Sequence, residues 1–128
     1  MTTGRTTAPA RHRAVAAAGL LACLALAGCG STAVAGIPAG ASVKSFCAAS
    51  ATFARSTQFD QGVKAADKLR DTGTPKGIPA DARHGFELVV DIVTKAKDKG
   101  DLEKRYTALT EKQKKSVAAL DAYITKTC

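Results

Sequence analysis

The stretch LEKRYTALTEKQKKSVAALDAYITKT, residues 102–127, decides the fold class of this chain. Steps of four and three residues separate its core positions, which are Leu102, Tyr106, Leu109, Gln113, Val117, Leu120 and Ile124. This period is typical of a helix that packs along its whole length against neighbouring helices. We therefore predict one long helix over residues 102–127, with Tyr106 and Tyr123 as packing residues.

Three further helices are predicted upstream of this stretch, over residues 42–57, 61–72 and 80–98. Asp60 is a plausible N-cap and Gly73 a plausible stop for the middle one, and the segment 74–79 (TPKGIP) forms a loop. Residues 80–98 contain several β-branched residues that also suit a buried strand, but their flanking charges and 3.6-residue period favour a helix. Gly100 is expected to end this helix and Asp101 to cap the next one. No segment shows sustained two-residue alternation, so the sequence predicts an all-α domain, a small four-helix up-down bundle.

A basic and then apolar stretch precedes this domain. Residues 1–13 contain Arg5, Arg11 and Arg13 and no acidic residue, and residues 14–27 (AVAAAGLLACLALA) are uniformly apolar. Fourteen helical residues cover about 21 Å, which is short of the roughly 30 Å hydrocarbon core of a bilayer. The pattern is typical of a secretory signal and not of a permanent membrane span.

The apolar run ends in Leu26-Ala27-Gly28-Cys29. This motif resembles the lipobox of bacterial lipoproteins. The resemblance implies cleavage between Gly28 and Cys29, a covalent diacylglycerol on the Cys29 thiol as the only attached group, and a lipid anchor at the extracytoplasmic face of the cell membrane. The alternative is an ordinary signal cleaved nearby. The expected organisation is a signal peptide over 1–28, a lipidated N-terminus and flexible tether over 29–41, and a helical domain over 42–128.

Cysteine usage supports export. If Cys29 is lipidated, Cys47 and Cys128 are left for an oxidising compartment, and the economical hypothesis is one disulfide between them; the alternative is two free thiols. In an up-down bundle the end of the last helix lies beside the start of the first, so this bond agrees with the predicted topology. The same layout places the tether, the loop 74–79 and the C-terminus at one end of the bundle.

The charge of the chain changes when the signal is removed. The 128 residues carry 19 basic and 11 acidic side chains, a formal net charge of +8. Loss of the three arginines in residues 1–28 leaves 16 basic residues and a net charge of +5. We therefore expect no nucleic-acid partner.

Motifs for catalysis are not visible in the sequence. The chain contains no G-x-S-x-G, no C-x-x-C and no phosphate-binding glycine loop. Asp81, His84, Glu87 and Asp91 could approach one metal ion from a helix, but their positions opposite the apolar face favour a solvated surface. We expect no metal, no other cofactor and no enzymatic activity.

A basic segment is the remaining candidate site. Its cations are Lys95, Lys97, Lys99, Lys104 and Arg105. They either form a patch for an anionic partner, such as a wall polymer, a lipid headgroup or an acidic protein, or belong to an ordinary solvated face. Binding at such a patch would weaken steeply as salt is added.

These observations favour a small membrane-anchored binding or interaction module of the cell envelope. In composition and cysteine placement the chain is similar to the small helical lipoproteins of high-GC Gram-positive bacteria, a resemblance that implies no particular activity. The alternative is a carrier that holds a small apolar molecule between its helices. A large apolar cavity would favour the carrier, and a tightly filled core would count against it.

Overall fold

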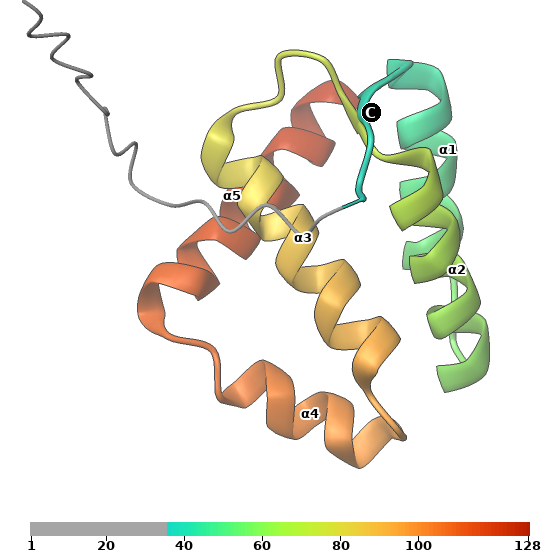
Figure 1. Cartoon of the computed structure of the whole chain (residues 1–128), viewed down its shortest axis with the longest axis vertical. Helices are drawn as coiled ribbons and strands as arrows, with labels where there is room; N and C mark the ends of the chain where they lie inside the picture. The colour runs from blue at the N-terminus through green and yellow to red at the C-terminus, as the bar shows by residue number, and fades with distance from the viewer. Residues whose placement is uncertain (1–35) are drawn as a thin grey trace, which may run out of the picture.

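The computed structural model describes residues 36–128, which form a mostly helical domain (Figure 1). Five helices and two short strands follow one another along these residues. The helices are α1 (Val43–Ala54), α2 (Phe59–Thr72), α3 (Ala80–Lys95), α4 (Lys99–Thr107) and α5 (Glu111–Thr127). The strands are β1 (Ala39–Ala41) and β2 (Thr74–Pro75), which pair in parallel.

The single long helix predicted over residues 102–127 is wrong, because the chain turns between α4 and α5. Thr110 ends the break as the N-cap of α5: its hydroxyl accepts from the Gln113 backbone N–H, and the Gln113 side chain accepts from the Thr110 backbone N–H. This reciprocal capping box starts a new helix. Leu109 lies buried in the turn against Ile92 and Val117, so the apolar period continues across a break in the backbone.

The third and fourth predicted helices also differ from the structure at their shared boundary. Ala96 is extended, which ends α3 at Lys95, and the Asp98 side chain caps α4 by accepting from the Asp101 backbone N–H. Gly100 therefore lies inside α4 and does not stop a helix. Asp98, three residues earlier than expected, supplies the cap.

The main core lies where α1, α2, α3 and α5 meet. Phe46 and Phe86 are almost fully buried there, with ring centroids 6.0 Å apart, and Tyr123 packs edge-on against Phe46. The other buried members are Ile37, Ala49, Leu69, Val90 and Leu120. The packing role predicted for Tyr123 is thus confirmed.

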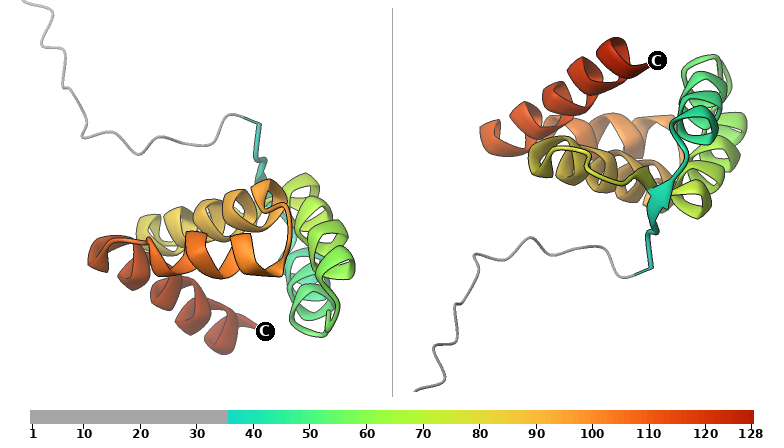
Figure 2. Two further views of the ribbon diagram at one scale, coloured as in Figure 1. Left: turned by 90° about the horizontal axis from the view of Figure 1, so that it is seen from below. Right: turned by 90° about the horizontal axis from the view of Figure 1, so that it is seen from above.

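The helices do not form a four-helix up-down bundle. Helices α1 and α2 lie side by side, whereas α3 crosses α5 and the two diverge beyond the crossing (Figures 1 and 2). The crossing is close because Gly85 of α3 has no side chain: a Cβ there would lie 2.6 Å from the carbonyl carbon of Ser116 in α5. Helix α4 runs from the end of α3 to the start of α5 and bridges the diverging helices (Figure 1).

Residues 36–41, which we assigned to a flexible tether, are packed against the domain. Ile37 is 7% exposed and belongs to the core. The Arg83 guanidinium donates to the backbone carbonyls of Ile37 and Pro38 and to the Thr74 hydroxyl, while its Nε pairs with the buried carboxylate of Glu87 at 2.7 Å. This arginine therefore fixes the start of the domain beside the loop that follows α2.

Candidate functional site

An apolar cavity of about 260 Å³ lies in the wedge between the diverging helices α3 and α5 and is closed on its far side by α1. Its apolar walls are Phe53, Ala54, Leu69, Phe86, Val89, Val90, Leu120 and Ile124. An engineered apolar cavity of about 150 Å³ is enough to bind benzene, so this space can hold a substantial hydrocarbon group.

The cavity continues into a wider space of about 650 Å³ under α4. The two spaces share Phe53, Val89 and Asp121, and the wider one is also lined by Leu102 and Tyr106 of α4. We call the two together the interhelical groove. The wider part lies within the range of about 300–1,000 Å³ that is typical of small-molecule pockets.

Helix α4 forms a lightly packed wall of this groove. None of its residues is buried. Tyr106 is 52% exposed and lines the groove, so the packing role predicted for it is wrong. The chain turns before Thr110, so Tyr106 lies on a different helix from Val117, Leu120 and Ile124. It therefore does not continue the buried face that the apolar period predicted for one long helix.

Ser50, Asp121 and Glu103 are polar groups on the groove walls, and Thr107 also lines the wider space. Ser50, 7% exposed, lines the deep cavity, and its hydroxyl has no hydrogen-bond partner within residues 36–128. Asp121 lies where the two spaces meet, and Glu103 lines the wider one. Neither carboxylate makes an ion pair with any described residue.

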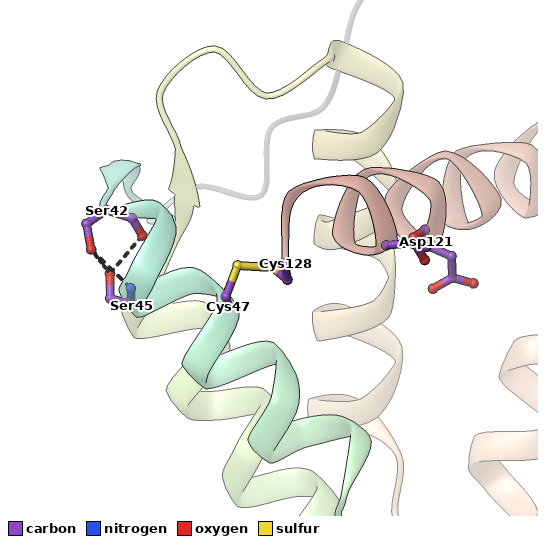
Figure 3. The surroundings of a disulfide bond; sticks show 6 residues. Ser42, Ser45, Cys47, Asp121 and Cys128 are labelled. Carbon is purple, nitrogen blue, oxygen red and sulfur yellow. Dashed lines mark hydrogen bonds between the residues drawn. A yellow bond between two sulfur atoms is a disulfide. The ribbon is translucent and has the colours of Figure 1, made fainter.

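The predicted disulfide between Cys47 and Cys128 is confirmed, with the two Cα atoms 5.5 Å apart. It ties the C-terminal end of α5 to the second turn of α1, and Asp121 lies further back along α5 with its side chain directed away from the bond (Figure 3). Because α1 and α5 form facing walls of the deep cavity, this bond limits how far the two walls can separate.

The cationic segment predicted as an anionic-partner patch is partly neutralised by the domain itself. Lys95 pairs with Asp91 at 2.6 Å, and Arg105 pairs with Asp101 at 2.9 Å. The hydrogen bond from Arg105, followed by that from the Lys97 backbone N–H, holds the pKa of Asp101 below its ordinary value. Among the five predicted cations, those without an ion pair in the described part of the chain are Lys97, Lys99 and Lys104.

The acidic and histidine positions weighed for a metal do not gather at one point. Glu87 is 4% exposed and bonded to Arg83, so it does not belong to the solvated face on which the sequence placed it. His84 is half-buried. Over residues 36–128 no group of three His, Cys, Asp or Glu side chains could hold a metal ion.

Several predicted features lie outside the described residues. These are the signal peptide over 1–28, the cleavage site at Gly28 and Cys29, the lipidated Cys29, and the tether as far as residue 35. Within residues 36–128, no helix combines the length and the apolarity needed to span a bilayer.

Comparisons with protein-family models, curated proteins and solved structures gave no match to this chain.

No local pattern in the sequence predicts the groove. Leu102 is one of the core positions that the apolar period predicts, and Phe53 is an apolar residue within the helix predicted over residues 42–57. A hint lies in Gly85: a glycine on the apolar side of a helix permits a close crossing, after which the two helices must diverge. The T-x-x-Q spacing at Thr110 is the signal that would have found the start of α5.

Proposed function

We propose that this chain is an exported, lipid-anchored binding module of the cell envelope, held at the extracytoplasmic face of the membrane. The observation that carries the proposal is the use of cysteine from residue 29 onward. Cys47 and Cys128 are bonded to each other, so Cys29, directly after Leu26-Ala27-Gly28, is the thiol left for a lipid. A diacylglyceryl group supplies two acyl chains, and two chains are what stable anchoring requires.

The arrangement of the domain is consistent with such an anchor. Strand β1, the loop after α2 and the C-terminus lie toward one end of the domain, and α4 and the α1–α2 turn lie toward the other (Figure 1). A membrane attached through the N-terminal segment would therefore adjoin the first end. The interhelical groove, which reaches Phe53, Leu102 and Tyr106, would be open to partners away from the bilayer.

The anchor is tested by expressing the full chain in a bacterium that processes lipoproteins. We expect the protein in the membrane and detergent fractions, with the mass of a diacylglyceryl group on the peptide that begins at Cys29. The Cys29→Ser chain should lose that mass and leave the membrane fraction. The control Cys23→Ser, which alters a residue of the predicted signal, should keep the added mass and stay in the membrane fraction. Unchanged mobility and detergent partitioning of Cys29→Ser would refute the anchor.

A second candidate function is a carrier of small apolar molecules, and one observation favours it: the groove is lined mainly by apolar side chains and has about 260 Å³ in its deeper part alone. A core filled to ordinary density leaves few voids larger than a water molecule.

The carrier function is tested with the neutral dye Nile red, whose fluorescence rises in apolar surroundings. We expect saturable binding to the Cys29→Ser chain. Ala54→Leu places extra bulk in the cavity wall and should weaken dye binding. Ala51→Leu adds the same bulk to an exposed position of the same helix outside the groove, so it is the control and should leave dye binding unchanged. Equal dye binding by the two variants, or none by the parent, would refute the carrier.

A further inference from the structure

We infer that the interhelical groove selects an amphiphile with a single hydrocarbon chain and a cationic head group. This inference rests on the proposed carrier function and adds the chemistry of the ligand. Three independent features carry it: the narrow apolar cavity, the carboxylates on the groove walls, and the exposed aromatic ring beside them.

The hydrocarbon part is indicated by the deep cavity between α1, α3 and α5. Apart from Ser50 and Asp121, its walls are aliphatic or phenyl groups, and its volume of about 260 Å³ suits one chain better than two. Each methylene that such a cavity takes out of water contributes about 0.8 kcal/mol, which corresponds to roughly fourfold tighter binding for every methylene added to the ligand.

The charge of the head group is indicated by Asp121 and Glu103. The described domain carries more basic than acidic side chains, yet these two carboxylates make no ion pair within residues 36–128. Both line the wider space, and Asp121 also lines the deep cavity. A chain inserted in the cavity would therefore leave its head group beside two carboxylates. A cation is favoured there and an anion is disfavoured.

Tyr106 adds a second attraction for a cation. Its ring lines the wider space and is about half exposed, and the face of a tyrosine ring attracts ammonium groups within about 6 Å of its centre. Lys99 lines an adjoining hollow between α4 and the α1–α2 turn, which shares Phe53, Val93 and Leu102 with the wider space, so this cation stands next to the groove but outside its two spaces. The charged side chains on the two spaces that form the groove are thus both acidic.

The test compares three probes that share a decyl chain: decyltrimethylammonium, decyl maltoside and decyl sulfate. Each is titrated into the Cys29→Ser chain below its critical micelle concentration, at low and at moderate salt. We expect the cationic probe to bind about fivefold more tightly than the neutral one and the anionic probe to bind most weakly. Added salt should reduce these differences, because the head-group contacts are exposed.

Variants separate the charge from the cavity. The double variant Asp121→Asn, Glu103→Gln should bind the neutral probe as the parent does and lose the preference for the cationic one. Asp71→Asn removes an exposed acid that lies outside the groove and makes no described ion pair, so it is the matched control and should keep the preference.

The outcomes distinguish the inference from the function on which it rests. If none of the three probes binds, the carrier function fails and the inference fails with it. If the neutral probe binds as tightly as the cationic one, or decyl sulfate binds most tightly, the carrier stands and the head-group selectivity is wrong. A preference that survives the double variant would also overturn the assignment to these carboxylates.

Discussion

Replacing Gly85 with alanine should force α3 and α5 apart at their crossing. A Cβ at this position would lie 2.6 Å from the Ser116 carbonyl carbon and 3.0 Å from the Val117 amide nitrogen, and closer still to the Ser116 carbonyl oxygen. Ordinary contact with a Cβ begins at 3.4 Å, and these neighbours are backbone atoms that cannot rotate away. The two helices must therefore separate by roughly 1 Å, because no side-chain adjustment relieves the clash.

The magnitude follows from two opposing effects. Overpacking of this kind costs up to about 3 kcal/mol, whereas alanine in a helix interior gains about 1 kcal/mol over glycine. The net loss of about 2 kcal/mol corresponds to a fall in Tm of about 8–16 °C for a domain of this size. Thermal unfolding followed by circular dichroism measures it, on protein with the disulfide intact.

Gly62→Ala is the matched control. Gly62 also lies inside a helix, α2, but a Cβ there would meet nothing within 4 Å. This variant should gain about 1 kcal/mol and raise the Tm by about 4–8 °C. If Gly85→Ala melts at or above the parent temperature, the close crossing of α3 and α5 is wrong, and the wedge that forms the groove loses its structural basis.

Three further predictions concern stability and titration. Arg83→Met should lower the free energy of unfolding in denaturant by about 3 kcal/mol, because it leaves the buried Glu87 carboxylate unpaired. It should also speed amide exchange over residues 36–41, and unchanged exchange would contradict the role of Arg83 in holding this segment. Reduction of the bond between Cys47 and Cys128, separated by 81 positions, should lower the unfolding free energy by about 4–5 kcal/mol, and equal stability in reductant would contradict a formed disulfide. Because the pKa of Asp101 is lowered in the fold, its ionised carboxylate stabilises the fold above the unfolded-state pKa of 3.8, and this contribution is lost as the pH falls through the folded-state pKa. Since the hydrogen bond from Arg105 is the main cause, Arg105→Gln should raise the pKa of Asp101 measured by NMR, and an unchanged pKa would contradict that cause.

Local periodicity in the sequence is enough to predict the helical class, and the number of cysteines is enough to predict the disulfide. Phe46, Phe86 and Val90 lie on predicted apolar faces and are buried. Cys47 and Cys128 were paired from their number and from the expected closeness of the chain ends. The helical class depends on an apolar period that repeats over many residues, and the disulfide depends on the small number of cysteines.

The break before α5 and the packed N-terminal segment could not be read in the same way. Leu109 keeps the apolar period while the backbone turns, so periodicity alone reports a continuous helix. Residues 36–41 are small and uncharged, and their order comes from Arg83, 42 or more positions away along the chain, and from pairing with β2. Contacts of that kind carry no local signature in a single sequence.

The groove depends on tertiary geometry for the same reason. Its walls come from α1, α2, α3, α4 and α5, and each wall residue alone resembles an ordinary core or surface position. Only the close crossing at Gly85 and the bridging position of α4 leave space between them.

The groove as a binding site is tested by mapping where a neutral amphiphile binds, with methyl NMR of the Cys29→Ser chain titrated with decyl maltoside. We expect saturable shifts of the methyl groups of Val89, Leu102 and Ile124, which line the groove, and none for Val43, which is 47% exposed on the outer side of α1. Shifts that favour Val43, that spread evenly over the surface, or that fail to saturate would contradict the groove as the binding site.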